Sequence, residues 1–536
     1  MRRRQFLQGG LALAVTSVLP RNRAMAADSQ SVFRHGVASG DPLTDRVIIW
    51  TRINSNQPTI VHWQVFADRN LRQMVQEGQV FALPQHDFTV KVDVHGLLPG
   101  QRYYYRFLAL GESSPIGRTK TLPLDPQEVR FGVVSCSNYP FGFFNVYGLL
   151  AERDDLDFIL HLGDYIYEYA EGHYGTGTPL GRAPDPLSEC IHLNDYRRRY
   201  AIYRTDPDLQ AAHAAHPFIT VWDDHELTND CWKHGAENHN PGEGSWEVRK
   251  KEAIRAYFEW LPIRPLWTSR VADDLYGTLH FNQLAGTEGN RRWQEGDPVI
   301  YRQFQLGRLA DLFMLDTRVI GRDKPLDVPD GVDVYKYASQ FPQRSMMGEV
   351  QEQWLYRSLL QSKKRGARWR LLGQQVQMAQ RTPGWDDIWD GYAPNRARLF
   401  QVLQKGVDNT VVLTGDIHSS WAAELSPNPF DANLYDPASG RGSLAVEFIT
   451  PSVTSPSSYN SLSENELNKA QTEIYAQHPH IKFCELKQHG YLEIQVTDET
   501  TKSIWHYVKT IASRDLTEVQ GPTWLVRSGM PHLQQT

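Results

Sequence analysis

The chain has 536 residues, of which 40% are hydrophobic and 22% charged, and its formal net charge is −6. This composition is that of a folded globular protein and excludes disordered, collagen-like and disulfide-framework chains. The negative charge argues against a broad basic surface for nucleic acid, and no apolar run reaches the ~18 residues that a helix needs to cross a bilayer. At roughly 150 residues per domain, we expect two to three domains.

The first 26 residues have the pattern of a cleaved export signal. Residues 2–4 are all Arg, residues 9–19 form a short apolar run, and residues 24–26 read Ala-Met-Ala, the small-residue pattern of a cleavage site. The stretch Arg-Arg-Gln-Phe-Leu-Gln at residues 3–8 resembles the twin-arginine signal R-R-x-F-L-K, from which it departs at Gln8. This resemblance implies export of the folded protein by the twin-arginine machinery, to the periplasm or the medium. An uncleaved anchor is the less favoured alternative, because the apolar run is too short to span a bilayer.

Residues 31–124 are predicted to form a small all-β domain. Apolar runs typical of strands occur at residues 47–53, 60–67, 88–94 and 103–107. Short strands at this spacing are typical of a small sandwich of the immunoglobulin or fibronectin type. The sequence of this segment contains no convincing helical period.

From residue 129 to residue 536, the pattern becomes that of an α/β domain. Helical stretches at residues 248–260 and 349–362 are interspersed with short apolar runs. These runs lie at residues 129–134, 157–162, 218–221, 311–315, 369–372 and 410–414, and late strands follow at residues 443–450, 491–496 and 503–508. Residues 461–475 are interpreted as an amphipathic surface helix, with a lid over the functional site as the alternative.

Six of these runs end in polar residues that are able to bind metal ions or anions. The six ends contain Ser135-Cys136-Ser137-Asn138, Gly163-Asp164-Tyr165-Ile166-Tyr167, Asp223-Asp224-His225-Glu226, Asp316-Thr317-Arg318, Gly373-Gln374-Gln375 and Gly415-Asp416-Ile417-His418. In open α/β sheets, ligands bind beyond the carboxyl ends of the strands. We therefore expect the six ends to converge on one crevice.

The first two ends carry three different donor types. Asp164 and Tyr167 offer a carboxylate and a phenolate, which suit a highly charged cation. Cys136 offers a thiolate at the end of the preceding run. The alternatives are a packing role for Tyr167 and a buried structural role for Cys136.

The third and sixth ends are rich in carboxylates. Asp223 and Asp224 are adjacent, and neighbouring carboxylates repel each other unless a cation neutralises them. Asp416 and His418 lie two residues apart, so in an extended segment both side chains point to the same side. Both ends are therefore interpreted as parts of a metal site.

Two other features leave alternatives open. Arg318 is able to grip a phosphate bidentately or to pair with Asp316. The four cysteines are irregularly spaced, so their pairing cannot be read from the sequence. Cys190 and Cys231 are one candidate disulfide in an exported protein.

Taken in chain order, the six ends, together with Ile449-Thr450-Pro451-Ser452, resemble the motifs of the calcineurin-like metallophosphoesterases, and in particular those of the PhoD-type alkaline phosphatases. The leading segment from Gly36 to Pro42 and the export signal resemble the same family, so the resemblance covers essentially the whole chain. It implies a metallophosphoesterase-type β-sandwich core flanked by helices, preceded by a small all-β domain. It also implies hydrolysis of phosphate esters outside the cytoplasm.

The resemblance further implies Fe³⁺ and one or more Ca²⁺ ions as cofactors. Cys136, Asp164 and Tyr167 match the iron ligands, and Asp164 also matches the residue that bridges to the calcium side. Asp224 and Asp416 stand where the wider superfamily has Asn and His. Both departures introduce carboxylates, which Ca²⁺ prefers.

The resemblance extends to three further positions, which match the family more or less closely. His225 matches the catalytic histidine of the superfamily, which stabilises charge or protonates the leaving oxygen. His418 matches a metal ligand, with a supporting role as the alternative. Gln374 matches a later ligand only loosely.

Other functions remain as alternatives at this stage. A phosphodiesterase or phospholipase D would use the same metals and differ in the mouth of the pocket, where Trp385, Trp389, Tyr392 and Arg396 either line the entrance or pack. An exported binding module without catalysis is the third hypothesis. Buried carboxylates without a cation or a function are costly, which argues against it.

Overall fold

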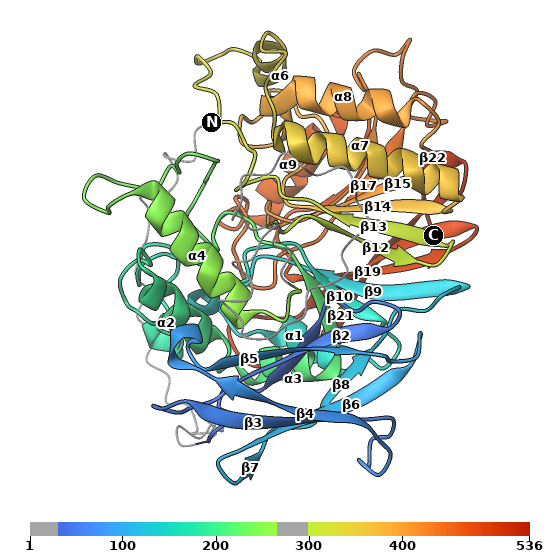
Figure 1. Cartoon of the computed structure of the whole chain (residues 1–536). Coiled ribbons are helices and arrows are strands. Elements are labelled where there is room, and N and C mark those ends of the chain that lie inside the picture. Colours follow the sequence, from blue (N-terminus) through green and yellow to red (C-terminus); the bar gives the residue numbers. More distant parts are fainter. Residues whose placement is uncertain (1–30, 265–298) are drawn as a thin grey trace.

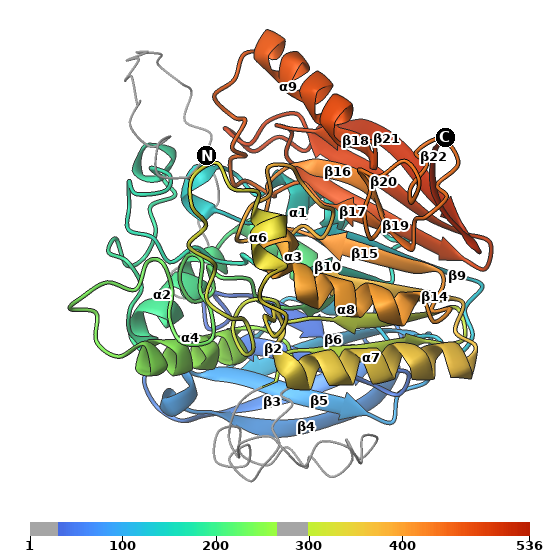
Figure 2. The same ribbon diagram turned by 90° about the horizontal axis from the view of Figure 1, so that it is seen from above.

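The computed structural model describes residues 31–264 and 299–536, so the predicted export signal at residues 1–26 lies outside the described residues. The described chain forms sheets of ten, seven and five strands (Figure 1). Helices α7 (Gly348–Arg365) and α8 (Ala393–Leu403) cover the outer face of the seven-stranded sheet, and the ten-stranded sheet lies against its other face (Figures 1 and 2). The predicted α/β class with a sandwich core flanked by helices is confirmed.

The ten-stranded sheet has parallel strands at its centre. Its order is β22 (Met530–Gln535), β21 (Glu518–Arg527), β20 (Thr500–Val508), β19 (Gly490–Thr497), β9 (Glu128–Val134), β10 (Phe158–His161), β11 (Pro217–Thr220), β1 (Val37–Gly40), β2 (Arg46–Arg52) and β5 (Thr89–His95). Strands β9, β10, β11 and β1 run parallel. Strands β10 and β11 are buried throughout, which fits the apolar residues that begin both sequences.

The seven-stranded sheet also has a parallel centre, formed by β13, β14, β15 and β17. Its order is β12 (Arg302–Leu306), β13 (Ala310–Met314), β14 (Trp369–Gln374), β15 (Thr410–Thr414), β17 (Ala445–Ile449), β16 (Ser420–Leu425) and β18 (Ile481–Glu485). The six predicted strand runs that end in polar residues are the parallel strands β9, β10 and β11 of one sheet and β13, β14 and β15 of the other.

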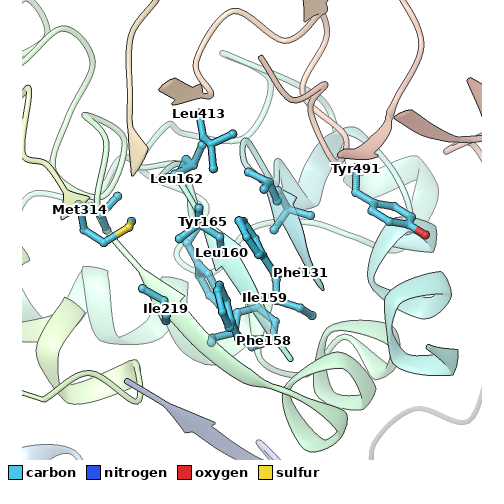
Figure 3. Close-up of a cluster of buried hydrophobic side chains, with 14 of the residues drawn as sticks. Phe131, Phe158, Ile159, Leu160, Leu162, Tyr165, Ile219, Met314, Leu413 and Tyr491 are labelled. Atoms are coloured by element: carbon cyan, nitrogen blue, oxygen red, sulfur yellow. The ribbon is translucent and has the colours of Figure 1, made fainter. Parts of the chain in front are cut away.

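The two sheets share one hydrophobic core. Phe131 and Ile219 from the ten-stranded sheet belong to the same buried cluster as Met314 and Leu413 from the seven-stranded sheet (Figure 3). Burying side chains of this size contributes about 1.5–3 kcal/mol each. The packing therefore fixes the position of one sheet relative to the other, and with it the relative position of the strand ends.

The N-terminal segment is all-β, as predicted, apart from one 3₁₀ turn within residues 31–124 (Pro84–His86). The five-stranded sheet is formed by β4 (Met74–Ala82), β3 (Thr59–Phe66), β6 (Arg102–Ala109) and β7 (Glu112–Ser113), with β8 (Gly117–Lys120) paired to β6. Strand β1, however, pairs with β11 of the ten-stranded sheet. A Cβ on Gly40 would lie 2.3 Å from the Pro262 carbonyl oxygen, so this close approach requires glycine. The ten-stranded sheet thus contains strands from both predicted domains. The limits of these domains stay a prediction.

Helices α1 (Asn145–Glu152), α2 (Leu193–Tyr203), α3 (Pro207–Ala215), α4 (Trp246–Trp260), α6 (Val334–Ala338) and α9 (Glu464–Gln477) complete the described fold. Helix α7 ends at Gly366, whose φ of +81° suits glycine. Helix α9 begins with a Ser463–Glu466 capping box, and Ile474 is its one buried residue, which fits the predicted surface helix. None of the helices in residues 31–264 and 299–536 has the length and apolar character needed to span a membrane.

Two buried histidines give the fold a defined pH dependence. Burial lowers the pKa of His161 from 6.5 to about 3 and that of His216 to about 4. The unfolded chain takes up both protons near pH 6.5, so the stability due to the neutral rings is lost as the pH falls from 6.5 towards 4. We expect the free energy of unfolding to fall by about 1.4 kcal/mol per pH unit for each histidine in this window.

Denaturant titrations at several pH values between 7 and 4.5 measure this slope. His216→Leu should reduce it by the contribution of one histidine, because the remaining groups are unchanged. An identical slope in the wild type and the variant would contradict the assignment.

Candidate metal centre and active site

The polar ends of the parallel strands meet where the two sheets adjoin. The loop after β9 is joined to the loop after β10 by a hydrogen bond from Cys136 N to the Gly163 carbonyl oxygen (3.1 Å). From the facing sheet, Gly415 approaches so closely that a Cβ there would lie 2.9 Å from Ser135. The ends of β9, β10 and β15 therefore meet, as the predicted convergence requires.

Three groups of buried donor atoms lie at this junction. They are Cys136 with Asp164 and His418, Asp164 with Asp224 and His225, and Asp223 with Asp224 and Asp416. Within each group, the donor atoms all lie within 4.8 Å of one another. Asp164 belongs to the first two groups and Asp224 to the last two, so the groups form one continuous cluster of donor atoms.

Tyr167 adds a phenol to the first group, next to His418. The Tyr167 hydroxyl donates to Asp164 Oδ2 (2.8 Å) and lies 3.2 Å from His418 Nε2. His418 Nδ1 lies 2.9 Å from the Pro456 carbonyl oxygen, which only accepts, so Nδ1 carries the proton. The lone pair of Nε2 then faces the cluster. This geometry favours His418 as a direct ligand over the supporting role that the sequence left open.

The donor set fits a bound cation. Asp164 Oδ1 and Asp223 Oδ2 are buried and have no hydrogen-bond partner among the described residues. Burial, and after it the charge of Asp164, raises the pKa of both Cys136 and Tyr167 well above the usual values. A cation reverses this effect, because it stabilises the thiolate, the phenolate and the unpaired carboxylate oxygens together.

Backbone strain is concentrated at the same residues. Cys136, Asp164, Asp416 and His418 have φ values of 62°, 55°, 63° and 55°. Left-handed backbone costs a non-glycine residue roughly 1–2 kcal/mol and persists only where the surroundings fix it. Four predicted ligands thus adopt a conformation that aims their side chains at the cluster at an energetic cost.

Arg318 is fully buried among carboxylates. Its guanidinium donates to Asp223 Oδ1 (2.5 Å), to both oxygens of Asp387 (2.8 and 2.9 Å) and to Asp416 Oδ1 (2.8 Å). Asp316, the partner considered from the sequence, instead accepts from the backbone N–H of Arg318. The arrangement favours a role in orienting carboxylates over direct capture of a phosphate.

Replacing Arg318 with Met should destabilise the metal-free protein by about 3–5 kcal/mol, because three carboxylates lose a buried partner. Urea titrations of the chelated protein measure this loss, and Ca²⁺ should reverse a substantial part of it. Arg370→Met is the matched control, since Arg370 is 2% exposed but pairs with an exposed aspartate. Equal losses in both variants, insensitive to Ca²⁺, would contradict the role of Arg318 at the cluster.

His225 is held by a carboxylate that the sequence analysis did not select. His225 Nδ1 lies 2.8 Å from Glu168 Oε2, and Glu168 Oε1 accepts from Asn229 N (2.7 Å). The Tyr167 ring packs on the imidazole at 4.3 Å between centroids. Burial alone would lower the pKa of His225, but the charge of Glu168 and its neighbours raises it well above the usual value. His225 is therefore fixed in orientation and favoured in its protonated form.

The sequence analysis placed Asp223 and Glu226 in a functional cluster but gave neither residue an individual role. Asp223 is a member of the third donor group. Glu226 accepts from the backbone N–H groups of Asp164 (3.1 Å), Tyr165 (2.5 Å) and Asp223 (2.8 Å). Glu226 thus ties the loop after β10 to the loop after β11. The sequence feature that points to both acids is the run of four polar residues that follows a buried strand.

The structure corrects the interpretation of Gln374. Its amide nitrogen donates to the Val376 carbonyl oxygen and to Thr414 Oγ1, both at 2.6 Å. Its oxygen accepts from Trp389 Nε1 (3.1 Å). Both ends of the amide are therefore used inside the protein, and Gln374 links β14 to β15 instead of offering an oxygen to a cation.

The residues considered for the mouth of the site are mostly core residues. Trp389, Tyr392 and Arg396 are buried, which favours the packing interpretation. Trp385 is 36% exposed, and the Arg381 guanidinium lies 5.1 Å from its ring centroid. Of these four residues, Trp385 alone remains a candidate for contact with substrate.

The disulfide that the sequence suggested between Cys190 and Cys231 is not formed. All four cysteines are buried and free. The two thiols lie in different surroundings: Arg249 donates to the Cys190 carbonyl oxygen, whereas Asp224 and Arg318 are charged neighbours of Cys231.

Comparisons with known proteins identify the family of the chain. The family model of PhoD-like phosphatases matches residues 131–505, and that of the PhoD-like phosphatase N-terminal domain matches residues 19–123. The chain is 34% identical over 531 residues to alkaline phosphatase D of Bacillus subtilis (strain 168), covering 94% of this chain and 83% of the relative. A solved structure titled "Structure of PhoD" superimposes with a TM-score of 0.80 at 30% identity, covering 95% of this chain and 92% of that one.

Proposed function

The chain belongs to the PhoD-like phosphatase family and is a hydrolase of phosphoric esters, and we propose that it is an exported alkaline phosphatase that cleaves monoesters with the help of Fe³⁺ and Ca²⁺. The observation that carries the proposal is the continuous donor cluster in which Asp164 is shared between two groups. Such sharing suits a two-metal centre, in which Asp164 would serve as a ligand to both ions.

The proposal assigns the donor residues to two ions by their chemistry and leaves His225 free for catalysis. The proposed Fe³⁺ ligands are Cys136, Asp164, Tyr167 and His418. The proposed Ca²⁺ ligands are Asp164, Asp223, Asp224 and Asp416, all carboxylates, as this ion prefers. Bound ions of this kind lower the pKa of a coordinated water and neutralise phosphate oxygens.

The chain's own residues then do three things. His225 faces the cluster and donates a proton to the oxygen of the leaving group, while Glu168 fixes the imidazole through Nδ1. Arg318 keeps Asp223 and Asp416 oriented through its buried ion pairs. Glu226 holds the backbone of the loops that carry the ligands.

Export by the twin-arginine machinery is part of the proposal. It is supported by the Arg-Arg-Gln-Phe-Leu-Gln stretch at residues 3–8 and the Ala-Met-Ala site at residues 24–26. A route that carries folded protein allows the metals to be loaded before export. Periplasmic or secreted protein beginning after Ala26 is the expected product.

Hydrolysis of p-nitrophenyl phosphate and of bis-p-nitrophenyl phosphate at mildly alkaline pH tests the proposed substrate class. We expect a higher kcat/KM for the monoester, and loss of both activities on chelation. The Arg370→Met variant controls for the general effect of a buried substitution on activity, because Arg370 is buried and lies outside the donor groups.

Each other outcome has a defined meaning. A higher kcat/KM for the diester would overturn the monoester assignment in favour of a phosphodiesterase or phospholipase D with the same metal site. Activity on neither ester, in protein shown to hold both metals, would favour an exported binding module.

A further inference from the structure

His161 is a buried residue that the proposed chemistry leaves without a role. It ends strand β10, is fully buried and belongs to none of the three donor groups. Its Nδ1 accepts from Gly163 N (3.2 Å), and its Nε2 lies 2.9 Å from the Tyr147 hydroxyl. Because a backbone N–H only donates, Nδ1 must be the acceptor and Nε2 must carry the proton.

This tautomer fixes the direction of the first bond in a buried chain of hydrogen bonds. His161 Nε2 donates to the Tyr147 hydroxyl, which in turn shares a hydrogen bond with Ser137 Oγ (2.6 Å). Each member of the chain is buried, so no water competes for these bonds. The chain runs from the loop after β10 to the loop after β9.

Both ends of this hydrogen-bond chain adjoin residues that are candidate metal ligands. Ser137 follows Cys136, and Gly163 precedes Asp164. The same two loops are joined directly, since Cys136 N donates to the Gly163 carbonyl oxygen (3.1 Å) and Ser137 N donates to the Asp164 carbonyl oxygen (2.8 Å). Gly163 is thus held through both its N–H and its carbonyl group.

The hydrogen-bond chain offers a physical reason why the candidate ligands with strained backbone stay in place. Cys136 and Asp164 both have left-handed backbone, which persists only when neighbouring contacts determine it. We propose that His161 is a positioning residue that, through Tyr147 and Ser137, holds the Cys136 and Asp164 loops ready for the cation before it binds. The inference rests on the proposed metal-dependent function and adds to it a source of metal affinity outside the ligands.

Titration of the chelated full-length protein with Co²⁺ tests this role, because the thiolate of Cys136 gives an absorption band when Co²⁺ binds. His161→Leu removes both hydrogen bonds and should weaken Co²⁺ binding about 10–100-fold, the usual effect of losing a group that orients a ligand. His161→Asn retains an acceptor for Gly163 N and should recover most of the affinity. Tyr147→Phe keeps the His161–Gly163 bond and should weaken binding less than His161→Leu.

His216→Leu is the matched control. His216 is equally buried, and its ring, at the start of β11, makes a hydrogen bond to the Leu150 carbonyl oxygen, whereas Asp223, Asp224 and His225 of the donor groups follow the end of that strand. It should lower the unfolding midpoint without changing Co²⁺ affinity. Unchanged affinity in folded His161→Leu and Tyr147→Phe, or equal weakening in His216→Leu, would overturn the inference. Weakened Co²⁺ binding in a protein that hydrolyses no ester would support the positioning role while the proposed function fails.

Discussion

Asp164→Asn should abolish metal-dependent ester hydrolysis while leaving the fold intact. Asp164 is the one donor common to the two groups that contain Cys136 and His225. Loss of a residue that merely supports a ligand costs about 10–100-fold in metal affinity, so loss of a shared ligand should exceed about 100-fold. Elemental analysis of the purified variant and its kcat/KM for p-nitrophenyl phosphate measure the two effects together.

The matched control for this variant is Asp208→Asn. Asp208 is also a buried carboxylate, but it pairs with Arg514 away from the donor groups. It should retain wild-type metal content and activity. An Asp164→Asn protein that holds both metals and hydrolyses the monoester normally would refute the shared-ligand assignment.

His225→Asn should lower kcat by roughly 10²–10⁴-fold with the metal content unchanged, the usual contribution of general acid catalysis. The size of the loss should depend on the leaving group. An alkyl phosphate, whose leaving oxygen needs a proton, should lose more than p-nitrophenyl phosphate, whose leaving group departs as a stable anion. Steady-state kinetics on the two esters give this ratio.

Glu168→Gln is the companion variant for His225. The amide oxygen still accepts from His225 Nδ1, but the negative charge that favours the imidazolium is lost. We expect a smaller loss than in His225→Asn, with the same dependence on the leaving group. Equal losses on both esters in His225→Asn would exclude proton donation as its role.

Much of the fold follows from local patterns that the sequence displays. The buried parallel strands are continuous apolar runs, so β9, β10, β11, β13, β14 and β15 were all predicted within a few residues. Strand β1 was missed because it has four residues, three of them small, and is fixed by pairing with β11, a distant segment. Strand β4 was missed because most of its residues are exposed or half-buried, which leaves a weak alternating pattern.

The site residues, too, were predicted where the local sequence is informative and missed where their contacts depend on tertiary packing. Cys136, Asp164 and Asp416 were predicted because each lies two or three residues beyond the end of a strand, a position that the chain order reveals. The partners of Arg318 could not be predicted, since Asp223 and Asp387 come from loops whose meeting depends on how two sheets pack. Gln374 was misassigned because its sequence position does not show that neighbouring strands occupy both ends of its amide.

The central claim is that hydrolysis depends on cations held by the shared donor cluster. Its most direct test is the rate of p-nitrophenyl phosphate hydrolysis by chelated protein, verified metal-free, on addition of Fe³⁺, of Ca²⁺ and of both. The account predicts that neither ion alone restores the full rate, that both together do, and that Asp164→Asn responds to no addition. Full activity in verified metal-free protein, or equal recovery in Asp164→Asn, would contradict it.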